Sequence, residues 1–189
     1  MINYCRVKRI FDIFFSLFLL VFLWPIFLLI SIIIFIQDGG PAIFRQERIG
    51  KNGVVFRFYK FRSMPLNTPS VESKDTQKLQ ITPFGKFIRR TNLDELPQFY
   101  NVLKGDMSFI GPRPPLPAQT ELIELRRING AFHLSPGLTG WAQVNSFDGM
   151  SVGEKVKFDG EYASKISFGF EVLILLKTIL YFTKKPPIY

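Results

Sequence analysis

The chain has 189 residues, which suits a single domain, and we predict one domain over residues 1–189. Its net charge of +9 favours an anionic partner, namely a nucleic acid, an anionic membrane face or a phosphorylated substrate. The one cysteine, Cys5, excludes an intrachain disulfide, and one cysteine with one histidine excludes a Cys/His metal cluster.

The first predicted element is an apolar segment over residues 10–36, in which Asp12 is the one charged residue. A spanning helix needs about 20 apolar residues, whereas the apolar region of a signal peptide has about 7–15 and precedes a small-residue cleavage site. No such site follows here, so the sequence predicts a membrane segment. Asp12 is expected either to pair with Arg9 or Lys8 at helical spacing or to be a solvated interfacial charge.

Two features of this segment argue against a simple span. Pro25 lies near its middle, where a missing N–H bends or breaks a helix. Basic residues flank both ends, and cytoplasmic flanks are enriched in Lys and Arg. We therefore predict a re-entrant membrane helix over residues 10–36 that breaks at Pro25 and has both ends on the cytoplasmic side. A kinked span is the alternative.

The rest of the chain predicts a mixture of short strands and helices. After a turn at residues 38–41, β-branched and aromatic residues predict a β-hairpin with strands at 42–49 and 54–61. A polar loop is expected over 65–80, an irregular proline-rich stretch over 111–117 and a turn over 135–140. Helices are expected over residues 82–90, 94–103, 118–128, 154–164 and 171–182.

These elements predict an α+β fold: a monotopic membrane protein with a small β-hairpin and a mostly helical cytosolic domain. The helix over 171–182 is apolar but too short to span, so it is expected to be an interfacial helix with one face in lipid. A buried core helix is the alternative reading of that segment.

Two adjacent carboxylates, Asp94 and Glu95, are the strongest candidates for chemistry. If Asp94 is the N-cap, Pro97 falls at the third helical position, where no N–H is needed. Free N–H groups at a helix N-terminus favour anions, including phosphate. A purely structural role, with Asp94 as a cap and Glu95 as a first-turn acid, is the alternative.

Basic residues lie close to this pair in the sequence, at Lys60, Arg62 and Arg113. Arginine grips phosphate with two hydrogen bonds, and a carboxylate can attack phosphorus to form an acyl phosphate. A divalent metal would bridge the phosphates. Acid and base beside a membrane therefore suggest phosphoryl transfer. The sequence lacks the GxxxxGK phosphate loop and the GxSxG nucleophile motif, and His133 is expected to be structural.

At this point the residues resemble a known family, the small monotopic phosphoglycosyl transferases, bacterial sugar transferases that act on undecaprenyl phosphate. The resemblance runs over nearly the whole length, and its motifs occur in the family's order. They cover residues 8–12, 60–64, 89–98, 101–108, 111–114 and 136–144.

The resemblance implies a catalytic domain over residues 1–189 and a two-step reaction. Asp94 matches the family's nucleophile, which attacks the β-phosphorus of a UDP-sugar so that UMP leaves. Undecaprenyl phosphate then attacks the covalent aspartyl phosphosugar, as the first membrane step of a glycan pathway. Glu95 matches the dyad partner associated with the metal, expected to be Mg²⁺. The substrate and phosphate residues implied are Lys60, Arg62, Arg89, Arg113, Asp159 and Tyr162.

The resemblance also implies a place in the cell and a set of partners. The enzyme is expected in the bacterial inner (cytoplasmic) membrane with its catalytic domain on the cytoplasmic face. Its partners are then the UDP-sugar, undecaprenyl phosphate and the lipid bilayer, without nucleic acid, and a homo-oligomer is left open. Two positions depart from the family: Trp24 replaces a small polar residue before Pro25, and Phe147 replaces an arginine expected to face the sugar nucleotide.

Two further hypotheses explain the charge without catalysis. A non-catalytic membrane-surface protein would bind anionic lipids or partners through its basic face. A membrane-tethered nucleic-acid binder would show strongly salt-dependent affinity. Neither needs the carboxylate pair beside basic residues, so both are the weaker alternatives.

Overall fold

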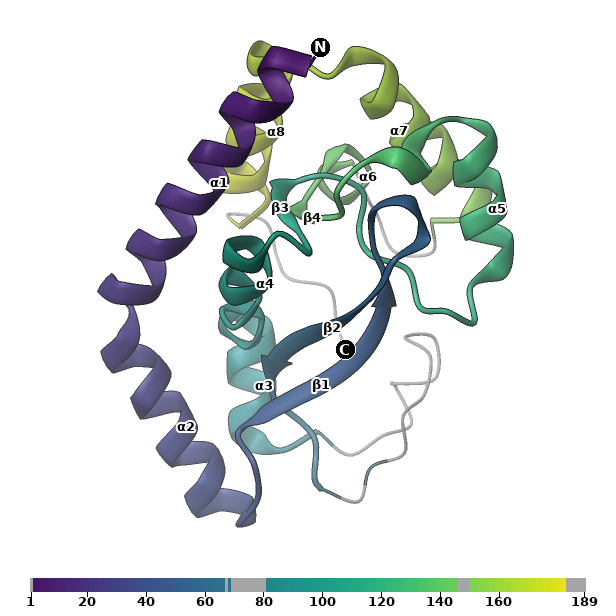
Figure 1. Ribbon diagram of the computed structural model, residues 1–189. Helices are drawn as coiled ribbons and strands as arrows, with labels where there is room; N and C mark the ends of the chain where they lie inside the picture. The colour runs from purple at the N-terminus through teal and green to yellow at the C-terminus, as the bar shows by residue number, and fades with distance from the viewer. Residues whose placement is uncertain (1, 67, 69–80, 146–149, 183–189) are drawn as a thin grey trace.

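The computed structural model describes residues 2–66, 68, 81–145 and 150–182. Most of the predicted loop over 65–80 and the departure at Phe147 lie outside the described residues. The two N-terminal helices run along one side of the molecule, with helix α8 (Phe168–Phe182) beside the N-terminal part of the first, and the hairpin and helices α5 (Thr120–Ile128) and α7 (Val152–Lys165) lie further away (Figure 1). The architecture is therefore a mixture of helices and short strands, as predicted.

The N-terminal apolar segment forms two helices, α1 (Ile2–Phe22) and α2 (Trp24–Asp38). The chain bends by 60° at the break between them, and Pro25 lies in the first turn of α2, where its missing N–H costs no helical hydrogen bond. Within the described part of the chain, no single helix is long and apolar enough to cross a membrane, but this bent pair meets both criteria together. The predicted break at Pro25 is confirmed.

The predicted hairpin is also confirmed. Strands β1 (Ile43–Ile49) and β2 (Val55–Phe61) pair antiparallel, and the short 3-10 turn η1 (Lys51–Gly53) joins them. Asn52 and Gly53 in this turn have positive φ angles of 56° and 81°. Asparagine and glycine tolerate this backbone conformation best, which is why the sequence between the strands closes a tight turn.

The carboxylate pair lies in a shorter turn than predicted. Helix α3 (Pro83–Arg90) begins as expected at Thr82, whose hydroxyl accepts from the Gly85 N–H at 3.0 Å. It is followed by the 3-10 turn η3 (Leu93–Glu95) and then by α4 (Gln98–Lys104).

The prediction of one helix over 94–103 with Asp94 as its N-cap is therefore wrong at its start. Asn92, at φ 54°, reverses the chain after α3 and precedes η3. Pro97, which has no N–H to give to a preceding turn, marks the start of α4. Asp94 is thus held inside a 3-10 turn, and its side chain caps no helix.

A second, parallel pair of strands was not predicted. Strands β3 (Ser108–Ile110) and β4 (Gly137–Thr139) pair side by side, so the turn expected over 135–140 is in part a strand. Gly111 and Gly137 approach so closely that a Cβ atom on either would overlap the other segment's backbone. Three-residue strands built around glycine carry almost no periodic signal, which explains the miss.

The remaining helices follow the predictions closely. Helices α5 (Thr120–Ile128), α7 (Val152–Lys165) and α8 (Phe168–Phe182) correspond to the three expected C-terminal helices. The short helix α6 (Trp141–Val144) and the 3-10 turn η4 (Ala131–His133) complete the described elements. Helix α8 exposes several large apolar side chains, among them Leu176, Ile179 and Leu180, so it is not a buried core helix.

An apolar cluster joins helix α2 to the rest of the molecule. Ile30 and Ile34 of α2 pack with Phe61 of β2 and Ile88 of α3. The opposite side of α1 and α2 exposes large apolar residues such as Phe14, Phe18, Phe22, Leu29 and Ile36.

Polar contacts anchor α1 at its N-terminal half. Glu171 of α8 accepts hydrogen bonds from Tyr4 and Lys8 of α1, each at 2.8 Å, and from Tyr162 of α7 at 2.6 Å. Asp12 is buried and accepts from the Phe109 N–H at 3.2 Å. Asp12 is therefore not a solvated charge: it is buried against β3, and the charges of Lys8 and Arg9 act on it, as expected from their helical spacing.

Candidate active site

Asp94 is buried between apolar neighbours. Its neighbours in η3 and just beyond, Leu93 and Leu96, pack against the cluster of Phe61 and Ile88. With apolar side chains on both sides anchored in the core, the intervening turn is drawn inward, and Asp94 is only 7% exposed. A carboxylate in such a place is poorly hydrated.

The protonation of Asp94 reflects this position. Burial raises the pKa of Asp94 to about 6, and the negative charge of Glu95 adds to the effect. Three cations, Lys60, Arg89 and Arg113, act in the opposite direction. The group is thus a buried carboxylate that stays mostly ionised at pH 7.

Glu95 is held by an ion pair with the proline-rich loop. The Arg113 Nη2 atom lies 2.9 Å from the Glu95 Oε1 atom. Burial works to raise the pKa of Glu95, but the charge and hydrogen bond of Arg113 outweigh it, so the pKa lies below its ordinary value. The two adjacent carboxyl groups therefore differ: one has a raised and the other a lowered pKa.

Lys60 and Arg89 bring further positive charge to the pair from two elements. Lys60 of β2 lies over the ring of its cross-strand partner Phe44, 5.3 Å from the centroid. Burial lowers the pKa of Lys60 to about 8, while the charge of Asp94 acts to raise it. The Arg89 Nε atom of α3 donates to the Ser63 hydroxyl at 2.7 Å. The predicted residues Lys60, Arg89 and Arg113 are thus brought together with the carboxylate pair.

Three other predicted substrate residues have protein partners elsewhere in the structure. Arg62 lies 3.3 Å from Asp38 at the end of α2. Asp159 lies 2.6 Å from Arg126, and the Tyr162 hydroxyl donates to Glu171. Contact of Arg62, Asp159 or Tyr162 with a substrate stays a prediction.

Two residues near the site were not singled out from the sequence. Arg48 of β1 interacts electrostatically with Arg113 and Glu95, and burial followed by the charge of Arg113 lowers its pKa to about 10. Gln98 is buried at the start of α4, and its side chain helps to lower the pKa of Glu95. The period-2 pattern of β1, which puts Arg48 on the same strand face as Phe44 opposite Lys60, was the available signal for Arg48.

The donor set fits Mg²⁺ of the kind that binds phosphates. Among the described residues, no three His, Cys, Asp or Glu side chains form a metal-binding group. Mg²⁺ in phosphate chemistry, however, takes one or two carboxylates and receives its other ligands from water and substrate. Glu95 offers one such carboxylate, and Asp94, adjacent in sequence and close enough for the two charges to interact, offers a second.

The sequence profile of the Bacterial sugar transferase family matches residues 3–185 of the chain. The chain belongs to the bacterial sugar transferase family. The match includes both N-terminal helices, the hairpin and every residue of the site described above.

Several curated relatives are similar to this chain over most of its length. It is 38% identical to the UDP-glucose:undecaprenyl-phosphate glucose-1-phosphate transferase of Escherichia coli, over 92% of this chain and 39% of the relative. It is 41% identical to the galactosyl transferase CpsE of Streptococcus agalactiae, over 76% of this chain and 35% of the relative. The uncharacterized sugar transferase EpsL of Bacillus subtilis is 37% identical, over 92% of this chain and 85% of the relative.

The match covers only part of the length of the longer relatives. The chain spans 35% of the length of the Streptococcus protein and 39% of the length of the Escherichia protein. Its site joins two carboxylates to three cations, an arrangement suited to a ligand that carries several phosphate charges.

Proposed function

We propose that this sugar transferase moves a sugar 1-phosphate from a UDP-sugar to undecaprenyl phosphate and releases UMP. The observation that carries the proposal is the buried carboxylate of Asp94, whose pKa is raised to about 6, beside Glu95 and the cations Lys60, Arg89 and Arg113. The name of the Escherichia coli relative, a UDP-glucose:undecaprenyl-phosphate glucose-1-phosphate transferase, supports the same reaction type.

In the first step a carboxylate oxygen of Asp94 attacks the β-phosphorus of the donor. The bond between that phosphorus and the bridging oxygen breaks, and UMP leaves with the electron pair. The product on the protein is an acyl phosphate that carries the sugar. Poor hydration of Asp94 favours the attack, and Lys60, Arg89 and Arg113 offset the negative charge of the diphosphate.

In the second step a phosphate oxygen of undecaprenyl phosphate attacks the same phosphorus. The bond to the Asp94 oxygen breaks, so the carboxylate is restored and the lipid diphosphate sugar is released. Glu95 would hold Mg²⁺, which, when bound, supplies charge neutralisation between the carboxylates and the phosphates. Arg113, already paired with Glu95 at 2.9 Å, lies where it can bind a phosphate oxygen as well.

The membrane arrangement is part of the proposal. Helices α1 and α2 form a re-entrant pair whose exposed apolar side lies in lipid and whose two ends face the cytoplasm. The exposed apolar residues of α8 lie at the membrane interface. Such a protein works at the bacterial inner membrane, where the lipid acceptor is found, in the first membrane step of a glycan pathway.

The test is UMP release by the detergent-purified protein with undecaprenyl phosphate, Mg²⁺ and a panel of UDP-sugars. We expect release with at least one sugar, and none from Asp94→Asn measured beside it. Trapping the sugar phosphate on Asp94, by omitting the lipid and analysing peptides by mass spectrometry, separates a covalent route from direct transfer. No release with any donor would refute the proposal and favour the non-catalytic membrane-surface protein.

A further inference from the structure

The proline-rich loop over residues 111–117 carries Arg113 and is held mainly by hydrogen bonds to its carbonyl groups. Four of its residues are prolines, which have no N–H, so its main chain is anchored chiefly through carbonyl groups. Four successive carbonyls accept hydrogen bonds from four different donors. These are Gly137 N to Pro112 O at 2.9 Å, Arg126 Nη1 to Arg113 O at 2.9 Å, Arg48 Nη1 to Pro114 O at 3.1 Å and Ile49 N to Pro115 O at 3.0 Å.

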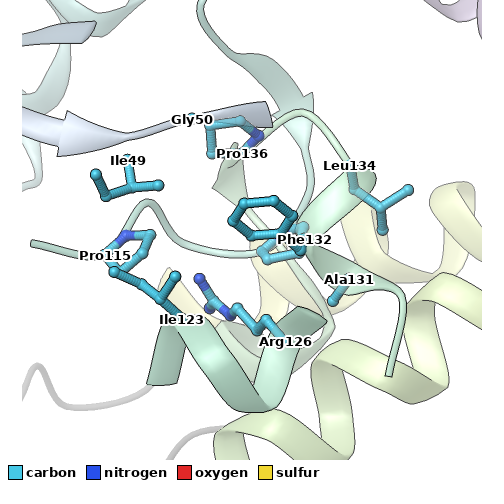
Figure 2. Close-up of a pocket in the computed structure, with 10 residues that line it drawn as sticks. Ile49, Gly50, Pro115, Ile123, Arg126, Ala131, Phe132, Leu134 and Pro136 are labelled. Carbon is cyan, nitrogen blue, oxygen red and sulfur yellow. The ribbon is translucent and has the colours of Figure 1, made fainter. Parts of the chain in front are cut away.

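Arg126 is the donor that holds Arg113 itself. It is 6% exposed and extends from α5 toward Ile123 and Pro115 in a small pocket beneath the loop (Figure 2). Its Nε and Nη2 atoms bind the Asp159 carboxylate of α7 at 2.8 and 2.6 Å. The planar guanidinium therefore has two nitrogens fixed by Asp159, and this directs the third at the Arg113 carbonyl.

We propose that Arg126 is a positioning residue, anchored by Asp159, that fixes the main chain of Arg113 so that the Arg113 guanidinium meets Glu95. The Arg113 guanidinium pairs with Glu95 at 2.9 Å, and the geometry of this pair depends on where the main chain of Arg113 lies. The proposal rests on the function proposed above. It gives Asp159 a role behind the site, through Arg126.

The geometry predicts why lysine cannot replace Arg126. A lysine keeps the positive charge that the buried Asp159 needs, but its single ammonium cannot span both Asp159 and the Arg113 carbonyl as the planar fork does. Arg126→Lys therefore releases the loop while leaving the ion pair in place. The adjacent Arg127 is the matched control, because its side chain is 55% exposed and pairs with Glu124 on the helix surface at 3.5 Å.

The experiment compares Arg126→Lys, Arg127→Lys, Arg113→Lys and the double variant Arg113→Lys/Arg126→Lys in the UMP-release assay. A misplaced group in an active site costs on the order of 10²-fold, so we expect such a loss of kcat/KM in Arg126→Lys and less than about 2-fold in Arg127→Lys. If Arg126 acts through Arg113, the double variant is no slower than the slower single variant. Losses that multiply would overturn the proposal.

Hydrogen exchange supplies a readout that does not depend on turnover. We expect peptides covering residues 111–119 to exchange faster in Arg126→Lys than in the parent, with no change in Arg127→Lys. Asp159→Asn, which weakens the anchor and leaves Arg126 its charge, should loosen the same loop and serves if Arg126→Lys unfolds. Unchanged exchange in both variants would refute the role of Arg126. Absence of turnover in the parent would refute only the proposed function, because the exchange result stands without it.

Discussion

At the scale of the residue, Asp94 carries a carboxyl group at a buried position, where the ionised form is less stable than in water. Its raised pKa means that burial destabilises the carboxylate relative to the neutral acid. A neutral side chain of the same shape removes that cost. Substitution of Asp94 can therefore separate the chemistry from the stability of the fold.

We expect Asp94→Asn to lower turnover by at least about 10³-fold, as removal of a nucleophile does, while the free energy of unfolding at pH 7 stays equal or increases. UMP release and thermal unfolding of the same preparation measure the two effects. A variant that keeps substantial activity would show that Asp94 is not the nucleophile. A variant that loses activity by unfolding would contradict the description of Asp94 as a destabilising charge.

Two shifted pKa values define a pH window for activity. The attacking form of Asp94 is the carboxylate, present above a pKa of about 6, and the phosphate-binding form of Lys60 is the cation, present below a pKa of about 8. We expect kcat/KM to fall below about pH 6 and again above about pH 8. Lys60→Arg should keep the acid limb and lose the basic one, because arginine stays charged. A basic limb that persists unchanged in this variant would assign it to another group.

At the scale of the element, one asparagine joins the two segments that carry the site. Asn101 of α4 is fully buried and bonds to the backbone of β2, with its amide N–H donating to Arg57 O at 2.7 Å and its Oδ1 accepting from Tyr59 N at 3.1 Å. The Asn101 side chain thereby bonds to the free edge of β2 as the main chain of a neighbouring strand would. The position of Lys60 relative to the carboxylate pair depends on this junction.

Asn101→Ala should lower the free energy of unfolding by about 1–3 kcal/mol, because it leaves a buried N–H and a buried C=O without a partner. Chemical denaturation in detergent measures the loss. Asn145→Ala is the comparison, since the Asn145 amide lies partly exposed and bonds to Trp141 one turn away and to Lys177. An equal loss in the two variants would contradict a special role for the α4–β2 junction.

The same scale shows what could be predicted from the sequence. The hairpin and the helices have strong signals, such as the Thr82 cap, the turn residues 50–53 between two segments rich in β-branched and aromatic residues, and the glycine after Lys104. Lys60, Arg89 and Arg113, expected from the sequence and the family resemblance to bind phosphate, lie close enough to act on Asp94, and their roles stay predictions. The parallel β3–β4 pair and the carbonyl contacts of the proline-rich loop were missed, because they join segments far apart in sequence and leave no local pattern.

At the scale of the whole molecule, the membrane arrangement proposed above depends on the bent pair α1–α2, because its geometry sets which side of the bilayer each end would face. Cys5, exposed near the start of α1, is a natural label for one end, and Glu47 on the exposed side of β1 is a site for the other. We expect Cys5, and Glu47→Cys in a Cys5→Ser background, to resist an impermeant maleimide added to intact spheroplasts and to react after lysis. Reaction of one position from outside would establish a kinked span in place of the re-entrant pair.

The hydrogen bonds from Tyr4 and Lys8 to Glu171 constrain the order in which the parts of the protein come together during synthesis. These contacts join residues separated by 167 and 163 positions, and a ribosome adds about 5–20 residues each second. Lys8 therefore waits roughly 10–30 s after its own synthesis before Glu171 emerges. Under the membrane arrangement proposed above, lipid and the hydrogen bonds from Arg9 to the Val102 and Leu103 carbonyls hold α1 during that interval. Helices α1 and α2 are then in place before the contacts of Glu171 form.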